Sequence, residues 1–466
     1  MSATIDLLGI GRGSIVAPAG CGKTHSIVDA VSRSAGKPVL VLTHTNAGVC
    51  ALRTRLARGR VAPARSRVAT LDGWALQIVL AYPELAGLRP DLLAVSYPAL
   101  RDAAIRALAS GALDVILHAT YSRVIVDEYQ DCSDQQHRLV LELARSLPCA
   151  VLGDPLQRIF DFGGTLPDWQ SQVLVDFPLV GELQEPFRWV NAGEPAYGQW
   201  ILHLRARLLA GAGADLTSVP ANVTWIDTSA PGSQWQAEQR AMAALAGIGD
   251  RHALIVGDAR NRGARAEFAR RHFQVEVVEP VDLTDLMQAV GPIAFATGAD
   301  RVTRAIAYAA SIMTGIDQPL FDHLQAVADD HVARNGAVDL AFLAAVADPS
   351  WRLIGRMLEA LASGPGRRVF RPELLSALCE GARRADAMGG DLRAGVLAIR
   401  EARRATGRAL PRFGIGSTLL LKGLEADHAM IQDATSLNAR HLYVAMSRAS
   451  RSLAVLSSSS LIGLAP

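Results

Sequence analysis

The chain contains very little lysine. Only three of its 47 basic residues are lysine, at positions 23, 37 and 422, so arginine supplies nearly all of the positive charge. A guanidinium group does not replace a compact ammonium group on a flexible stem where chemistry requires one. We therefore expect Lys23 and Lys422 to lie in functional segments.

Other absences narrow the class of protein. The five cysteines are scattered and never form a Cys-x-x-Cys pair, so the sequence indicates neither a disulfide framework nor a zinc site, and we expect a cytoplasmic location. No run of roughly 18 apolar residues and no basic-then-apolar N-terminus occurs, which predicts neither a membrane span nor a secretion signal. The 45 acidic residues nearly cancel the 47 basic ones, so no overall basic field indicates a nucleic-acid partner.

The length and composition are typical of a soluble globular chain. Its 466 residues are half hydrophobic and one fifth charged, which suggests about three domains. In the first half, short β-rich runs alternate with helical segments, and this alternation predicts a parallel sheet covered by helices. The β-rich runs cover residues 14–16, 39–43, 67–70, 124–126 and 150–152.

A second strand–helix pattern begins near Val223. It continues at residues 253–256, and strand-like sequence returns near Ser417 and at 453–456. Helical sequence rich in Ala and Leu interrupts both halves of the chain. We expect a first α/β domain at 1–74 and 121–186 with a helical insertion at 75–120, and a second at 187–284 and 406–466 with a helical insertion at 285–405.

A phosphate-loop pattern follows the first apolar run. Its residues are Ala17, Pro18, Ala19, Gly20, Cys21, Gly22, Lys23 and Thr24, and a helix-like stretch comes next. Gly20 and Gly22 allow backbone N–H groups to turn toward phosphate oxygens. Lys23 is expected to reach the β- and γ-phosphates, and the Thr24 hydroxyl to ligate Mg²⁺. The pattern predicts a site for ATP with Mg²⁺.

Two adjacent carboxylates follow the apolar run at 124–126. Asp127 is expected to hold the Mg²⁺, and Glu128 to orient a water molecule and remove its proton. Adjacent Asp-Glu pairs are common on solvated surfaces. Their position directly after a buried-type strand favours the functional interpretation here.

With the sequence DEYQD at 127–131, the chain resembles superfamily 1 helicases of the UvrD/PcrA/Rep type. Further similar segments follow in that family's order: LTHTN at 42–46, GDPLQRIF at 153–160, QEPFR at 184–188, KGLE at 422–425 and LYVAMSRA at 442–449. The resemblance covers residues 16–449. It implies an α/β fold class, with two RecA-like parallel-sheet domains, an ATP cleft between them, and a helical insertion in each.

The resemblance also implies roles for individual residues in ATP hydrolysis. Gln157 is expected to sense the γ-phosphate, and the aromatic Phe187 to stack on adenine. Arg188 is expected to touch the γ-phosphate, and Arg448 to act as an arginine finger. The KGLE segment adds Gly423 and Glu425 to the residues expected to bind the nucleotide.

The same resemblance indicates a surface for single-stranded or tailed DNA. Thr45 and Asn46 lie where the family holds DNA phosphates, and Phe160 and Phe162 lie where it places aromatics against bases. Trp74 is a third candidate for base stacking, which suits a motor because every base presents a π-face. Aromatics spaced two apart are also common in the core at strand ends, and that interpretation stays open.

The departures from the family lie mainly on the DNA side. Asp72 stands where the family has a His, and Leu419 replaces the His three residues before Lys422. The sequence before Ala17 has no Gln of the kind that reads adenine in this family, so selectivity for ATP is less secure. The ATPase interpretation is therefore stronger than the unwinding interpretation.

Three functional hypotheses remain. The first is a DNA-stimulated ATPase that translocates along single strands and unwinds duplex, in the 3′ to 5′ direction that the resemblance implies. The second is a DNA-sensing ATPase that regulates a separate nuclease, similar to helicase-like subunits of anti-phage defence systems such as Gabija. The third and weakest is a ring-forming ATPase that takes its arginine finger from a neighbour.

Overall fold

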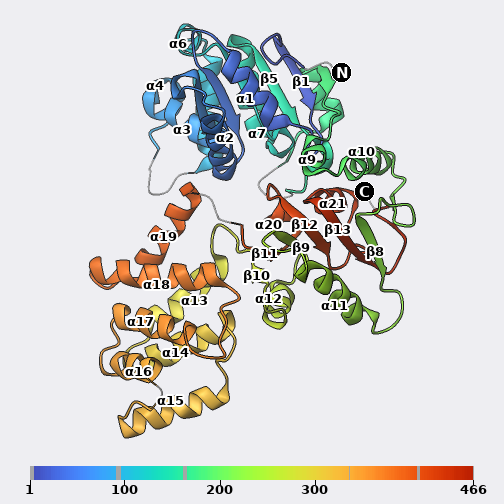
Figure 1. The fold of residues 1–466 in the computed structure, drawn as a ribbon. Coiled ribbons are helices and arrows are strands. Elements are labelled where there is room, and N and C mark those ends of the chain that lie inside the picture. Colours follow the sequence, from blue (N-terminus) through green and yellow to red (C-terminus); the bar gives the residue numbers. More distant parts are fainter. Residues whose placement is uncertain (1–4, 91–95, 161–164, 335, 407–409, 465–466) are drawn as a thin grey trace. The chain divides into compact units, whose positions relative to one another are not determined.

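The computed structural model describes residues 5–90, 96–160, 165–334, 336–406 and 410–464 (Figure 1). The chain divides into two compact units. The first consists of Met1–Ala230, Ala434–Leu453 and Ser457–Pro466, and the second of Pro231–Asp433 and Ala454–Leu456. Two large sheets, each with parallel strands and flanking helices, confirm the predicted α/β fold class.

The first sheet has six parallel strands in the order β3-β2-β4-β5-β1-β6. They are β1 (Arg12–Val16), β2 (Val39–Thr43), β3 (Ser66–Thr70), β4 (Arg123–Val126), β5 (Cys149–Gly153) and β6 (Leu179–Glu182). Every residue of β2 and β5 is buried, as expected for parallel strands covered on both faces. In this register Ser14 lies opposite Val151, and Val41 opposite Ile125.

Helices cover both faces of the first sheet. On β2, Val39 and Val41 belong to the hydrophobic cluster that contains residues of α1 and α2, whereas Leu40 and Leu42 belong to the cluster that contains residues of α3, α5 and α7. The helices of this unit are α1 (Lys23–Arg33), α2 (Asn46–Arg58), α3 (Leu71–Ala81), α4 (Pro83–Ala86), α5 (Tyr97–Ala109), α6 (Asp114–Thr120), α7 (Asp134–Ser146), α8 (Leu174–Asp176), α9 (Phe187–Ala192), α10 (Pro195–Leu209) and α21 (Ala439–Met446).

Short elements complete this part of the chain. They are the single turns η1 (Pro63–Arg65), η2 (Tyr129–Asp131), η3 (Pro155–Gln157) and η4 (Trp169–Val173), and the antiparallel pair β7 (Ala214–Asp215) and β14 (Leu461–Ile462). The turn η2 directly follows Asp127 and Glu128, and the turn η3 contains Gln157.

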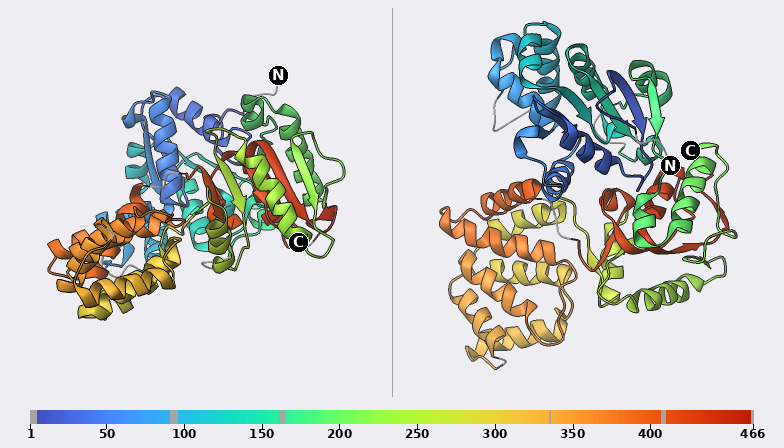
Figure 2. Two further views of the ribbon diagram at one scale, coloured as in Figure 1. Left: turned by 60° about the horizontal axis from the view of Figure 1, so that its bottom comes forward. Right: turned by 45° about the horizontal axis from the view of Figure 1, so that its top comes forward.

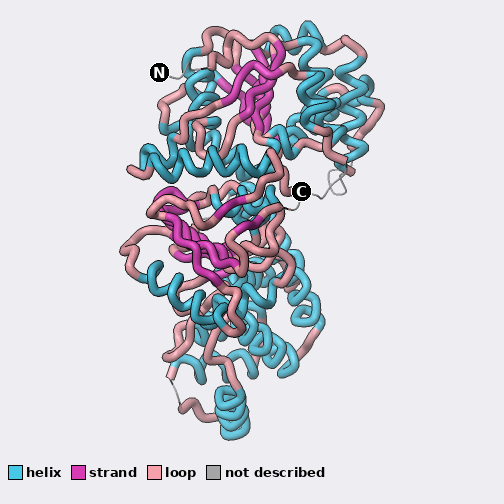
Figure 3. Tube along the Cα trace, turned by 90° about the vertical axis from the view of Figure 1, so that its right-hand side faces the viewer, coloured by secondary structure: helices cyan, strands magenta, loops and turns pink. Residues whose placement is uncertain are grey.

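The second sheet has the strand order β10-β11-β9-β12-β13-β8. Its strands are β8 (Val223–Asp227), β9 (Ala253–Val256), β10 (Glu276–Val277), β11 (Phe413–Gly416), β12 (Ala426–Ile431) and β13 (Ala449–Ser457), and the helices near them in sequence are α11 (Ser233–Ala246), α12 (Arg262–Arg271) and α20 (Thr418–Leu421). β9 is parallel to both β11 and β12. Figure 3 shows the strands of each sheet side by side, with helices around them.

The second unit also contains an all-helical part with its own hydrophobic core. Its helices are α13 (Thr284–Phe295), α14 (Gly298–Ile312), α15 (Gln318–Asp330), α16 (Ala337–Ala347), α17 (Trp351–Ala362), α18 (Pro372–Ala387) and α19 (Leu392–Thr406), and Figure 2 shows them gathered together. α17 is strongly amphipathic, with Trp351, Ile354, Leu358 and Leu361 buried.

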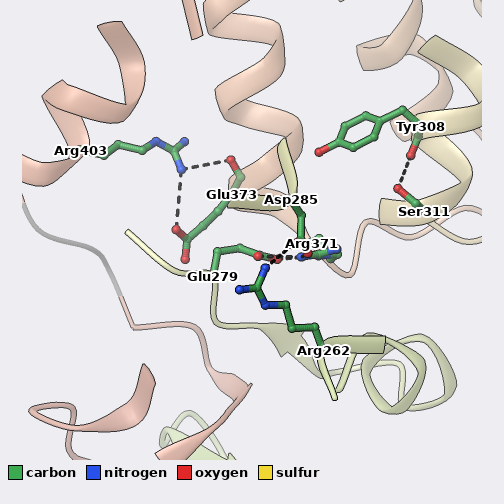
Figure 4. A network of polar contacts seen from close by, with 8 residues as sticks. All are labelled: Arg262, Glu279, Asp285, Tyr308, Ser311, Arg371, Glu373 and Arg403. Carbon is green, nitrogen blue, oxygen red and sulfur yellow. Dashed lines mark hydrogen bonds and ion pairs between the residues drawn. The ribbon is translucent and has the colours of Figure 1, made fainter. Parts of the chain in front are cut away.

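Buried ion pairs connect this helical part to the segments around β10 (Figure 4). Arg371, just before α18, donates to both carboxylate oxygens of Glu279 at 2.6 and 2.8 Å and to Asp285 at 2.5 Å. Asp285 in turn pairs with Arg262 at the start of α12, at 2.9 Å. Burial by itself would lower the pKa of Arg371, but the two carboxylates raise it above its ordinary value, so the guanidinium stays charged.

Some elements differ from the sequence-based expectation. β6 was not predicted, because it is an edge strand whose residues are mostly exposed and show no apolar run. α3 begins at Leu71 and so crosses the expected domain boundary at residue 75. In the described part of the chain, no single helix is long and apolar enough to cross a membrane; the bent pair α5 and α6 passes that test by length and composition only.

Candidate active site

The phosphate loop connects β1 to α1. Gly20 and Gly22 both adopt left-handed backbone conformations, with φ of 71° and 84°, and Gly22 caps the N-terminus of α1. Glycine adopts these angles without steric cost. The Ala17 N–H donates to the Gly153 carbonyl at 2.8 Å, which joins the loop to the end of β5. Thr24 is the second residue of α1, at the helix end where backbone N–H groups favour anions.

The α9 segment covers the phosphate loop. A Cβ atom on Gly20 would lie 2.5 Å from the Trp189 ring, and one on Gly22 would lie 2.9 Å from the Phe187 ring. The Arg188 N–H donates to the Gly20 carbonyl at 3.1 Å. The loop thus requires glycine for both its backbone angles and this close approach, and the structure brings Phe187 and Arg188 to the predicted phosphate site.

Lys23 lies between the two predicted catalytic carboxylates. Its Nζ is 3.0 Å from Asp127 Oδ1 and 2.5 Å from Glu128 Oε1. Burial alone would lower the pKa of Lys23, but the two carboxylates raise it above its ordinary value. Burial raises the pKa of Asp127, and the Lys23 charge opposes that effect. The structure therefore groups a largely buried cation with two acidic groups beyond the carboxyl ends of β1 and β4.

Glu128 has an unusual backbone conformation. Its φ is 55°, in the left-handed region that residues with a Cβ rarely adopt and that is often found at functional sites. Gln130 donates from Nε2 to Glu128 Oε2 at 2.6 Å, and its Oε1 accepts from the Asp154 N–H at 3.1 Å. Gln130 therefore connects the turn after β4 to the turn after β5.

Asp154 is the centre of a buried polar group next to Gln157. Gln157 Nε2 donates to Asp154 Oδ2 at 3.0 Å, and Arg205 of α10 donates to Asp154 Oδ1 at 3.2 Å. Arg205 also contacts Glu182 Oε1 at 2.6 Å. Burial by itself would lower the pKa of Arg205, but the acidic neighbours raise it. Arg205 therefore fixes the position of Asp154, and Asp154 fixes the position of Gln157, the predicted γ-phosphate sensor.

Arg205→Ala is expected to destabilise the first unit by about 3–5 kcal/mol, because it leaves buried Asp154 without its cationic partner. Denaturant unfolding followed by circular dichroism measures this change. Arg89→Ala is the matched control: Arg89 also pairs with a carboxylate, Glu84, at 2.6 Å, but both side chains are exposed, so stability should hardly change. Equal effects of the two substitutions would contradict the structural role of Arg205.

The helix α21 contacts the phosphate loop from a distant part of the sequence. The Tyr443 hydroxyl accepts from the Ala19 N–H at 3.0 Å. Arg448 follows the end of this helix; it is 3% exposed and donates from Nε to the Val444 carbonyl at 2.8 Å. Arg188 Nη1 donates to the Ser447 carbonyl. Both predicted arginines therefore belong to the same compact unit as Lys23.

The predicted DNA contacts are only partly described. Thr45 caps α2 by accepting from the Gly48 N–H at 3.1 Å, and both Thr45 and Asn46 are exposed. Phe160 is partly buried, with its ring centroid 6.0 Å from that of His44. Phe162 lies outside the described residues.

The prediction that Trp74 stacks on bases is wrong. Its side chain is 1% exposed and belongs to the hydrophobic core between the first sheet and α3. The neighbouring Asp72, which replaces the family's His, forms a two-point ion pair with Arg101 at 2.6 and 2.7 Å. This segment therefore packs within the domain.

Gly423 and Glu425 lie in the second compact unit, directly after α20. Gly423 has a φ of 82°, so it forms a turn that residues with a Cβ adopt at a cost. Glu425 is exposed. Their role in nucleotide binding stays a prediction.

Four residues of this site have no function predicted from the sequence: Gln130, Asp154, Arg205 and Tyr443. Three of them lie inside segments that the family resemblance identifies. Arg205 lies in none, yet the sequence holds a signal, because it interrupts the apolar stripe of Ile201, Leu204 and Leu208 on α10. A charged residue at such a position needs a buried partner.

Together these features define a class. A glycine-rich phosphate loop between a strand and a helix, facing two carboxylates at the end of another parallel strand, is the arrangement of phosphate-loop nucleotide-binding proteins. Comparison with known proteins adds a match to one family model, over part of the chain.

Residues 99–178 match the family model of the UvrD/REP helicase N-terminal domain. This region includes β4, the Asp127 and Glu128 carboxylates, and β5. The resemblance to UvrD-like superfamily 1 helicases is therefore confirmed for this region of the chain. No curated protein matches the sequence.

Among solved structures, the chain is similar to the arterivirus nonstructural protein 10, a helicase. The structure of that protein with DNA matches with a TM-score of 0.35 and 9% identity, over 97% of this chain and 64% of that chain. A second structure of the same protein matches with a TM-score of 0.33 and 10% identity, over 96% of this chain and 59% of that chain. The chain thus spans less than two thirds of the length of these proteins.

Proposed function

We propose that the protein is an ATP-hydrolysing motor that moves along single-stranded DNA and unwinds duplex, in the 3′ to 5′ direction. The carrying observation is the position of Lys23 between Asp127 and Glu128 beside a phosphate loop, in a chain whose residues 99–178 match a UvrD/REP helicase model. The family match supports helicase activity. The polarity and the response to DNA are part of the proposal.

The residues present suit ATP with Mg²⁺. Thr24 and Asp127 offer hydroxyl and carboxylate oxygens, the hard ligands that Mg²⁺ takes when most of its other positions are filled by phosphate and water. In the described residues, no group of three or more His, Cys, Asp or Glu side chains could hold a metal ion. When bound, the metal would neutralise charge on the transferred phosphoryl group.

The protein residues would then take separate roles. Lys23 would leave its two carboxylates for the phosphate oxygens, and Glu128 would accept a proton from the attacking water. Arg188 and Arg448 would stabilise the charge that develops on the γ-phosphate. Gln157, held by Asp154, would sense whether that phosphate is present.

We also propose the domain limits that this function needs. A first RecA-like domain would comprise residues 1–74 and 121–186, and a second one 187–284 and 406–466. The segments 75–120 and 285–405 would be their helical insertions. The helices at 284–406 and their separate hydrophobic core support the second insertion.

ATP turnover with and without single-stranded DNA, then with RNA, tests the proposal directly. We expect DNA to stimulate turnover. Strand displacement on duplexes with a 3′ or a 5′ tail then tests unwinding and direction. Turnover that DNA does not change would contradict the proposed motor.

One structural observation favours an alternative, a DNA-sensing ATPase that regulates a separate nuclease with little unwinding. The segment where the family contacts DNA carries Asp72 in an ion pair with Arg101 and Trp74 in the core. DNA-stimulated turnover without strand displacement would support this alternative.

Glu128→Gln is expected to preserve ATP binding and to slow hydrolysis by at least ~10²-fold. An amide keeps the volume and the contact with Gln130, but it cannot accept the proton of the attacking water. Single-turnover kinetics with a separate nucleotide-binding assay distinguish the two effects. Glu84→Gln, at an exposed position, should leave both unchanged. Rapid hydrolysis by the Glu128 variant would place the catalytic base elsewhere.

A further inference from the structure

One segment of the first unit carries basic residues without acidic ones. Between Asp29 and Asp72 the sequence contains eight basic residues and no Asp or Glu, although acidic residues almost equal basic ones over the whole chain. Six arginines occur within 15 residues, at positions 53, 55, 58, 60, 65 and 67. They cover the end of α2, the following turn and β3, which is an edge strand of the first sheet.

All six arginines are exposed, and we name the surface of residues 53–65 the α2–β3 basic surface. Arg67 is not part of it, because it donates to Gln77 of α3, which covers the other face of the sheet. Arg53 donates to the Val68 carbonyl, Arg65 to carbonyls at the end of α1, and Arg67 to Gln77. Within the described residues, none of the six forms an ion pair with a carboxylate. Surface arginines elsewhere in this unit, such as Arg89 and Arg145, do have carboxylate partners. The positive charge here is therefore uncompensated.

Arg60 adopts a left-handed backbone conformation that normally favours glycine. α2 ends with the Arg60 N–H bonded to the Ala57 carbonyl and the Val61 N–H bonded to the Leu56 carbonyl, both at 3.0 Å. This termination requires a left-handed residue, usually glycine, and Arg60 supplies it with a φ of 54°. The adjacent Gly59 has an ordinary φ of −74°. Arginine thus occupies the position that backbone sterics assign to glycine.

The positive charge and the lack of aromatic residues on this surface indicate which form of DNA it would bind. Uncompensated arginines bind phosphate groups and release counterions from DNA. Single strands are usually held by aromatic side chains as well, because their bases are free to stack. Residues 30–71 contain no Phe, Trp or Tyr. A duplex, whose bases are already stacked, can be held by phosphate contacts alone.

We propose that the α2–β3 basic surface binds the phosphate backbone of duplex DNA, separately from the nucleotide site and from the predicted single-strand contacts. The inference rests on the proposed function in one respect, namely that DNA is the partner. Arg55, Arg58 and Arg60 contribute most, since no hydrogen bond from their side chains to protein competes with a phosphate in the described structure.

Arg60→Gly separates a binding role from a structural one. Glycine suits the left-handed backbone, so the melting temperature should stay the same or rise by roughly 1–3 °C. Affinity for a blunt 20-base-pair duplex should nevertheless fall about three-fold or more. An unchanged duplex affinity would show that Arg60 binds no phosphate.

The triple variant Arg55→Gln, Arg58→Gln, Arg60→Gly tests the whole surface. Fluorescence anisotropy with the same duplex between 50 and 200 mM salt gives the slope of log Kobs against log salt. The slope should become shallower by about 0.9 for each lost phosphate contact, so by roughly 2–3 in total. A control that removes paired arginines, Arg89→Gln, Arg145→Gln, Arg304→Gln, should change it by less than half as much.

Two further measurements distinguish a failure of the basic-surface proposal from a failure of the proposed motor function. Binding of an oligo-dT strand should change less than duplex binding; an equal loss would overturn the assignment to duplex. Oligo-dT should stimulate ATP turnover of the triple variant as it does that of the parent protein. If the parent itself is not stimulated, the proposed motor fails, whereas a wild-type salt slope in the variant overturns only the basic surface.

Discussion

Lys23→Ala is expected to abolish ATP turnover. Lys23 Nζ forms ion pairs with both predicted catalytic carboxylates, and alanine provides neither this counter-charge nor a ligand for the β- and γ-phosphates. The transition state should lose several kcal/mol of stabilisation, at least ~10³-fold in turnover. Steady-state phosphate release at saturating ATP, with single-stranded DNA present, measures the effect.

Lys37, another of the three lysines of the chain, provides the control. Lys37 is exposed and its ammonium group donates to the His118 carbonyl, so Lys37→Ala should retain nearly full turnover. Thermal unfolding of both variants separates loss of activity from loss of fold, because removal of Lys23 also leaves buried Asp127 unpaired. Turnover near the wild-type level in a folded Lys23 variant would contradict the phosphate-loop assignment.

Arg448→Ala is expected to lower ATP turnover by ~10³-fold or more. The helix before it is anchored to the phosphate loop through Tyr443 and Ala19, and Arg188 bonds to the carbonyl of the neighbouring Ser447. Because Arg448 is buried and donates to the Val444 carbonyl, the substitution should also cost about 1–2 kcal/mol of stability. Turnover should therefore be measured well below the melting temperature.

Arg448→Lys should not restore activity, because an ammonium group cannot bridge two phosphate oxygens as a planar guanidinium does. Arg356→Ala is the matched control, since Arg356 is an exposed arginine of α17 in the helical part. It should leave turnover nearly unchanged. If both alanine substitutions changed ATP turnover equally, Arg448 would have no special role in hydrolysis. That result would contradict its assignment as an arginine finger.

The strands that position the site could be predicted from the sequence. Parallel strands buried on both faces are continuous apolar runs, and β2 matches its predicted limits of 39–43. The ends of such strands meet at one edge of the sheet, so a loop after β1 and carboxylates after β4 had to lie together. The observed contacts between Lys23 and Asp127 follow from that topology.

The rest depends on packing that the sequence does not display. Trp74 lies on α3, a helix that is apolar on most of its surface, and only the structure shows that the indole is buried. Arg205 finds its acidic partners 51 and 23 residues away, at Asp154 and Glu182. β6 has an exposed edge with no apolar pattern. Each of these features is set by tertiary contacts between segments whose own patterns are ambiguous.

The discontinuity of the first compact unit has a consequence for its synthesis. Residues 434–453 also belong to this unit, yet they are synthesised about two hundred residues after Ala230. At ordinary translation rates of about 5–20 residues per second, this delay lasts roughly 10–40 s. During that time the Trp189 indole and the Tyr197 hydroxyl lack their carbonyl partners at Ala449 and Met446. The contacts between α21 and the segments around the phosphate loop therefore form late in synthesis.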